Sequence, residues 1–93
     1  MTRSLRELES EAFGAQRRQD YTGAAVIWLK IVAQCDNWEH GGAHFCLAGC
    51  YLDLGKVDQA IEHYKRASEL RPWDPMFAET WIDTQRAKDE GLI

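Results

Sequence analysis

Apolar residues recur at helical spacing in the centre of the chain, between residues 44 and 72. Residues that are three, four and seven positions apart share one face of a helix. Gly55 is placed to end a first helix and Pro72 to end a second. The pattern therefore predicts a hairpin of two helices packed through two apolar stripes: Leu47, Ala48 and Tyr51 before the turn, and Ala60, Tyr64 and Ala67 after it.

The segment before this hairpin shows a similar but less regular pattern. Ser4 and Glu7 have the spacing of a helix capping box, which predicts a helix from Leu5 to near Gln19. A turn signal at residues 20–23 precedes a second apolar stripe that extends to about Cys35. The predicted inner residues of this pair are Leu5, Leu8, Ala12 and Ala15, and then Ala24, Ile27, Trp28 and Ile31.

A fifth helix is predicted after the central hairpin. Asp74 is a favourable N-cap, and Pro75 is favourable in the first helical turn. No partner helix is predicted beyond it, so we expect this segment to cap the apolar end of the structure. Its predicted inner stripe repeats the spacing of the central hairpin: Ala78, Trp81, Ile82 and Gln85.

The central pattern resembles the tetratricopeptide repeat, a helix–turn–helix unit of about 34 residues. His44, Ala48 and Tyr64 stand where Trp, Gly and Phe are usual, with similar packing volumes. The resemblance implies an all-α, tetratricopeptide-like right-handed array of α-hairpins. It comprises five helices in a single domain, 1–93, with repeats at about 4–36 and 39–72 and a capping helix at about 75–90.

The first of these repeats is degenerate. Ala24 and Trp28 align with Ala60 and Tyr64 at an offset of 36 residues, two more than the usual period, and we place the extra residues at 36–38. Two further departures weaken the copy: Glu11 replaces an expected Leu, and Gln19 replaces the turn glycine.

The resemblance also implies a function, because repeats of this family hold a peptide or helix of a partner protein on the concave face formed by the first helix of each hairpin. We therefore expect a non-catalytic interaction module, an adaptor or chaperone-like protein with a protein or peptide partner. The residues that would line this face are Arg6, Glu9, Phe13, Arg17, Phe45, Gly49, Leu52, Asp53, Met76, Glu79, Asp83 and Arg86.

Phe13 and Phe45 are the predicted anchors on this face, since exposed aromatic side chains suit a binding groove. The alternative is that five helices curl tightly enough for both rings to complete the core. The carboxylate clamp known from the family is not expected, because Phe45 and Gly49 stand where its polar side chains would lie.

Residues 12–46 also resemble a group of small bacterial regulators, the PerC-like activators and the negative regulators of AraC-type proteins. The residues shared with them include Ala12, Tyr21, Trp28, Trp38 and Phe45. This second resemblance implies an alternative function, transcriptional control through contact with another regulatory protein.

Charge and composition narrow the range of partners. The formal net charge is −4, whereas phosphate binding needs a concentrated basic face, so direct nucleic-acid contact is not expected. The N-terminal residues are charged and no run of about 18 apolar residues occurs, so we expect a cytoplasmic protein without membrane contact. A short array with exposed ends also favours self-association through the first or the last helix.

Candidate chemistry is sparse. His40, His44, Cys46 and Cys50 lie close in sequence, but His44 and Cys46 project about 200° apart around a helix. We therefore expect reduced, packed cysteines and no metal site. No nucleophile motif or phosphate loop is present, so neither catalytic residues nor cofactors are expected.

The four tryptophans fall into two groups. Trp28 and Trp81 lie on predicted inner stripes and are expected in the core. Trp38 and Trp73 lie in connections between helices. There they would either cover helix ends or be available to a partner.

Overall fold

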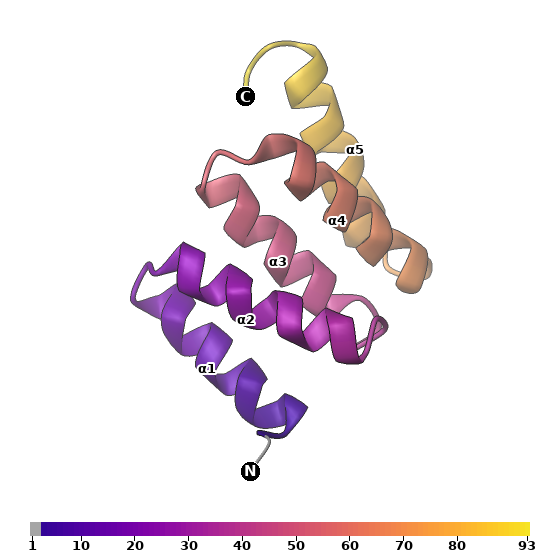
Figure 1. Cartoon of the computed structure of the whole chain (residues 1–93). Coiled ribbons are helices and arrows are strands. Elements are labelled where there is room, and N and C mark those ends of the chain that lie inside the picture. The colour runs from indigo at the N-terminus through magenta and orange to yellow at the C-terminus, as the bar shows by residue number, and fades with distance from the viewer. Residues whose placement is uncertain (1–2) are drawn as a thin grey trace.

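The computed structural model describes residues 3–93, which form five helices joined by short turns (Figure 1). Each helix packs mainly on its neighbours in sequence. The result is an elongated array of 46 × 28 × 18 Å with the two termini at opposite ends. The tetratricopeptide-like all-α architecture is thus confirmed, with helices α1 Leu5–Arg17, α2 Tyr21–Gln34, α3 Gly42–Asp53, α4 Val57–Leu70 and α5 Pro75–Asp89.

Local sequence signals determine several helix ends. The capping box at the start of α1 is present, with the Ser4 hydroxyl accepting from the Glu7 amide and the Glu7 carboxylate accepting from the Ser4 amide. Asp74 caps α5 by accepting from the Met76 amide, and Pro75 follows it. These side chains satisfy backbone donors that have no partner within the helix.

The turn between α1 and α2 forms without a glycine. Gln19 has φ +61°, close to the +76° of Gly55 at the corresponding place in the second hairpin. Asp20 then starts α2 by accepting from the Gly23 amide. The degenerate first hairpin therefore keeps the turn of the second, with a non-glycine residue in the left-handed region.

The core comprises two clusters of buried residues, one across α1, α2 and α3 and one across α3 and α4, and Tyr51 of α3 packs against both. Trp28 is 1% exposed, and its Nε1 donates to the Gln16 Oε1 at 2.8 Å. Alanines bring the helices close together at buried positions on four of the five helices, α1 to α4. Of the predicted inner residues of the first hairpin, Leu8, Ala12, Ala15, Ala24, Trp28 and Ile31 are buried, whereas Leu5 and Ile27 are half-buried.

The connection between α2 and α3 has an unusual backbone. Glu39, His40 and Gly41 have φ values of +53°, +48° and +86°, three left-handed residues in succession. The Arg71 guanidinium holds this loop by donating to the Glu39 carbonyl at 2.7 Å and the His40 carbonyl at 3.1 Å. The connection as a whole also includes residues 36–38, where the sequence analysis placed the two extra residues.

The predicted inner stripe of α5 is wrong. Phe77 and Thr84 are its buried residues, whereas Ile82 is 45% exposed and Trp81 is half-buried. In α3 the equivalent stripe packs on both sides, since Leu47 lies in the cluster with α1 and α2 and Ala48 in the cluster with α4. Within residues 3–93 no helix follows α5, so it buries the side that packs on α4 instead.

None of the helices between residues 3 and 93 combines the length and apolar character needed to cross a bilayer.

Candidate functional site

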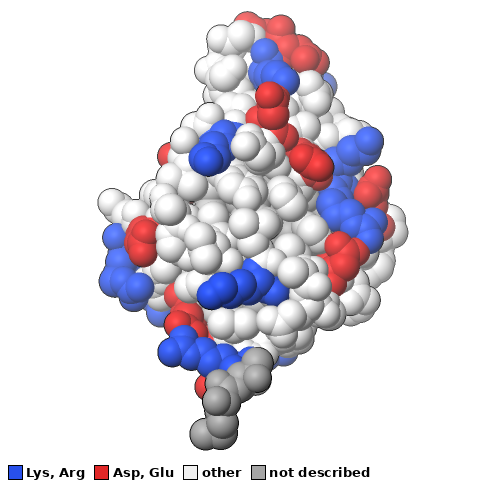
Figure 2. Space-filling view, viewed as in Figure 1, with Lys and Arg blue, Asp and Glu red and all other residues white. Residues whose placement is uncertain are grey.

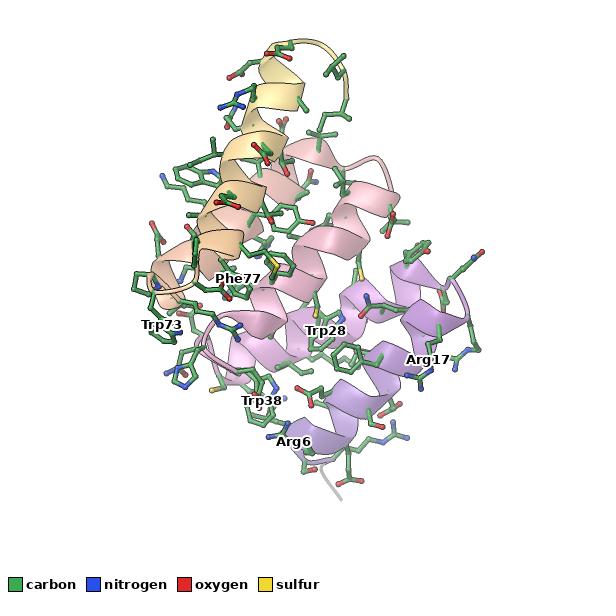
Figure 3. The ribbon with its side chains drawn as sticks, turned by 180° about the vertical axis from the view of Figure 1, so that it is seen from behind. Arg6, Arg17, Trp28, Trp38, Trp73 and Phe77 are labelled. Carbon is green, nitrogen blue, oxygen red and sulfur yellow. The ribbon has the colours of Figure 1, made fainter. Side chains whose placement is uncertain are left out.

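The first helix of each hairpin and the final helix, α1, α3 and α5, share one side of the array, which is seen in Figure 3. We call this side the odd-helix face. The three helices contain all twelve residues predicted from the sequence to contact a partner. Eight of them are exposed, and four are half-buried: Glu9, Phe45, Gly49 and Leu52.

Phe13 is the exposed aromatic residue of α1, with 40% of its surface accessible. Its ring meets the edge of the Trp28 ring with centroids 5.1 Å apart and planes at 81°. Because Trp28 is buried, it gives Phe13 a rigid support. An aromatic ring held in this way loses little conformational entropy when a partner covers it.

Phe45 contacts other aromatic rings as well as solvent. Its ring stacks on Phe77 of α5 at 4.4 Å and 14°, and meets Tyr64 of α4 edge-on at 5.1 Å. Arg71 lies over the Phe77 ring at 4.2 Å. The half-buried Phe45 ring therefore joins α3, α4 and α5, and it stays a predicted groove residue with a second, structural role.

Two of the predicted contact residues form an intramolecular cluster around Trp38. Its Nε1 donates to Glu9 at 2.8 Å, and the Arg6 guanidinium lies 4.9 Å from the ring centroid. Arg6 also pairs with Glu9 and Glu39, each at 2.9 Å. This cluster attaches α1 to the connection between α2 and α3. Of the two roles predicted for Trp38, covering a helix end and contacting a partner, the structure shows the first.

Trp73 occupies the corresponding connection between α4 and α5 but is 65% exposed. Its ring meets His40 edge-on, with centroids 5.5 Å apart. Arg6, Trp38, Phe77 and Trp73 thus lie along the same end of the helices on the odd-helix face, whereas Arg17 lies at the other end of α1 (Figure 3).

Charged side chains occur on all three helices that share the odd-helix face. Among the predicted contact residues, α1 contributes Arg6, Glu9 and Arg17, α3 contributes Asp53, and α5 contributes Glu79, Asp83 and Arg86. Arg6 pairs with Glu9 and Glu39, and Arg86 pairs with Asp83, so the charge difference between α1 and α5 is small.

A polar network that was not predicted from the sequence joins α3, α4 and the connection before them. The buried His44 Nε2 lies 2.8 Å from Asp36 Oδ1, and its Nδ1 lies 3.0 Å from Nδ1 of His63. Arg66 pairs with the other carboxylate oxygen of Asp36. These residues line a hollow of about 370 Å³. Because they come from distant parts of the sequence, no local sequence pattern predicts that they meet.

The contact between the two imidazole rings requires one hydrogen between the two facing Nδ1 atoms. With Asp36 ionised, His44 donates from Nε2, so one of the two facing Nδ1 atoms must carry a hydrogen and the other must accept it. Arg66 and His44 hold the Asp36 pKa at about 2, which keeps this carboxylate ionised. If both histidines were protonated, two N–H groups would face each other.

Acidification is therefore expected to weaken the contact between α3 and α4. Burial, reinforced by the nearby His44, lowers the pKa of His63 below its usual 6.5. Protonation of His63 is therefore more favourable in the unfolded chain than in the folded one. The stabilising contribution of neutral His63 to the free energy of unfolding is complete above about pH 7 and is lost as the pH falls through 6.5. Urea unfolding at pH 7.5 and 5.5 should show lower stability at the acidic pH.

The matched variants for this prediction are His63→Gln, which removes the titrating ring, and His40→Asn, which removes an exposed one. The loss of stability on acidification should be smaller in His63→Gln than in the natural protein, and unchanged in His40→Asn. Equal pH dependence in His63→Gln and the natural protein would contradict the assignment.

The cysteines have little nucleophilic character. Burial raises the pKa of both Cys46 and Cys50 to about 11, so both are thiols at neutral pH. Among the residues that the structure describes, no group of three or more His, Cys, Asp or Glu side chains is placed to hold a metal ion.

Antiparallel helix pairs stacked in sequence, with one helix of each pair on a shared face, define a helical-repeat protein. Residues 42–74 match the tetratricopeptide repeat family model, so the segment spanning α3, α4 and the turn after them is a tetratricopeptide repeat. No curated protein matches the sequence closely enough to count as a relative. Repeats of this family serve in general as protein–protein interaction modules.

Proposed function

We propose that this protein is a non-catalytic adaptor that holds a peptide or a helix of another protein across its odd-helix face. The observation that carries the proposal is an exposed aromatic ring on this face, Phe13, that is rigidly supported by the buried Trp28. Apolar anchors of this kind supply most of the affinity of protein interfaces, and charge sets orientation.

The middle of the odd-helix face has room for a partner's backbone. Gly49 lies there on α3, and a Cβ added to it would meet only the Tyr64 hydroxyl, at 3.8 Å. Leu52 is half-buried one turn further along the same helix. A peptide that crosses α3 would therefore approach its backbone closely at Gly49 and contact apolar side chains on either side.

The charges suggest the composition of such a peptide. A partner with an apolar side chain for Phe13 would carry an acidic residue where it meets Arg17 on α1, because Arg6 already pairs with Glu9 and Glu39. It would carry basic residues where it meets Glu79 and Asp83 on α5. Complementary charges at the rim raise the association rate more than the affinity.

The test is a selection of random peptides on the immobilised protein, followed by affinity measurements on three variants. Phe13→Glu should weaken binding of the selected peptides at least tenfold, because it places a charge where an apolar side chain was covered. Gly49→Arg should also weaken it, by filling the space over α3.

Lys65→Glu, a charge change on the exposed side of α4, is the matched control and should leave the affinity unchanged. Thermal unfolding of each variant would confirm that it is folded. Peptides that bind Phe13→Glu and Gly49→Arg as tightly as the natural protein would refute the proposed site.

A further inference from the structure

The outward side of α2 is apolar. Val26 and Leu29 are 48% and 40% exposed. Together with the exposed residues Thr22 and Ala33 they are spaced by four, three and four positions, which places all four on one side of the helix. We call these four residues the α2 stripe.

The second hairpin provides an internal comparison, because α2 and α4 are equivalent helices. The buried residues Ala24, Trp28 and Ile31 of α2 correspond, 36 positions later, to the buried residues Ala60, Tyr64 and Ala67 of α4. At the same offset the α2 stripe corresponds to four residues that are all charged and all exposed: Asp58, Glu62, Lys65 and Glu69.

This comparison shows whether the apolar residues of the α2 stripe are needed for folding. The helix α4 folds and packs with charged residues at the outward positions, so the fold does not need apolar residues there. Charged or polar residues are also the usual occupants of a solvent-facing helix surface. The apolar residues of the α2 stripe are therefore suited to a contact outside the chain.

The apolar surface extends beyond the helix. A hollow of about 260 Å³ lies beside the α2 stripe, lined by Ala25 of α2 and by Tyr51 and Leu54 at the end of α3, with Lys56 at its rim. Figure 2 shows an area without charged side chains in the middle of this face, with Lys or Arg side chains above and below it; this face is opposite to the odd-helix face.

We propose that the α2 stripe and the adjoining hollow form a dimer interface, on which α2 of a second copy lies antiparallel. The order Thr22, Val26, Leu29, Ala33 runs from small to large and back to small, so it is nearly the same in both directions. An antiparallel pair would place Val26 against Leu29 of the second copy and Thr22 against its Ala33. Such self-complementarity is what a two-fold symmetric interface requires.

The charges and dimensions of this surface fit that occupant. The α2 stripe contains no charged residue, so pairing it with itself buries no unpaired charge. A 14-residue helix is about 21 Å long, and two such helices in contact bury less than the roughly 800 Å² per partner of a standard interface. Even with Tyr51 and Leu54 added, the dimer should be weak and concentration-dependent.

The first test measures molar mass by analytical ultracentrifugation over about a hundredfold range of concentration reaching the millimolar region. The natural protein should shift from 10.7 kDa towards twice that value. The double variant Val26→Glu, Leu29→Glu would place carboxylates against each other in the antiparallel pair, so it should remain at 10.7 kDa and keep its helical content, as α4 does with charged residues at the equivalent positions.

The matched control is Ile82→Lys, which removes an apolar residue of α5 with 45% exposure. It should associate like the natural protein. A natural protein that stays monomeric at every concentration, or an Ile82→Lys variant that is impaired as much as the double variant, would overturn the proposal.

A mixing experiment tests the antiparallel arrangement itself. The single variants Val26→Glu and Leu29→Lys should each associate at least tenfold more weakly than the natural protein. In an equimolar mixture the introduced carboxylate of one chain meets the introduced ammonium of the other, so association should recover in part. Absence of recovery would contradict the pairing of position 26 with position 29.

Discussion

Replacing Gly41 by alanine is expected to lower the free energy of unfolding by about 2 to 5 kcal/mol. Gly41 has φ +86°, where a residue with a Cβ costs about 1–2 kcal/mol. The added Cβ would also lie 2.8 Å from the backbone carbonyl oxygen of Ala67, and such overpacking typically costs about 1–3 kcal/mol. Urea unfolding followed by circular dichroism would measure the difference.

Gly55→Ala is the matched control for this substitution. Gly55 also has a left-handed backbone, with φ +76°, but a Cβ added there would meet no atom within 4 Å. It should therefore show only the cost of the backbone conformation, about 1–2 kcal/mol. Equal losses at the two glycines would mean that the close contact between Gly41 and α4 has no energetic importance.

Replacing Trp28 by alanine is expected to lower the stability by about 3–5 kcal/mol, the usual cost of removing a large buried aromatic side chain. The substitution leaves a cavity between the first two helices and removes the partner of the Gln16 side chain. Since a domain of this size has a total stability of about 5–15 kcal/mol, the loss is a large fraction of it.

Trp73→Ala provides the comparison, because Trp73 is 65% exposed and its loss should cost less than about 1 kcal/mol. Trp28→Phe should give an intermediate result by keeping part of the ring volume. Urea unfolding of the three variants would refute the assignment if Trp28→Ala and Trp73→Ala were equally stable. Trp28→Ala should also weaken peptide binding, because Trp28 supports the Phe13 ring.

The elements that the sequence predicted well depend on residues close together in the chain. The capping box of Ser4 and Glu7 and the start of α5 at Asp74 and Pro75 involve contacts across two or three positions. The apolar stripes of the first four helices predicted the two hairpins because their residues are only three or four positions apart. The stripe of α5 was mispredicted because the buried side of a helix depends on its neighbours, and among the described residues α5 packs mainly on α4, with Phe77 also stacking on Phe45 of α3.

The features that sequence analysis missed depend on distant residues. The left-handed loop at residues 39–41 is held by Arg71, more than thirty positions away. The network of His44 and His63 needs Asp36 and Arg66 from two further places in the chain. Spacing predicted Phe45 as a groove residue, but only the structure shows that its ring stacks on Phe77.

The sequential packing of the helices has a consequence for how the chain reaches its structure. Because each helix contacts mainly the helix before and the helix after it, most contacts close loops no longer than about one repeat. Chains with such local contacts lose little entropy before their contacts begin to stabilise them, and they fold rapidly. The α3–α4 hairpin, which contains the most regular repeat, is a natural starting point from which order would spread to both sides.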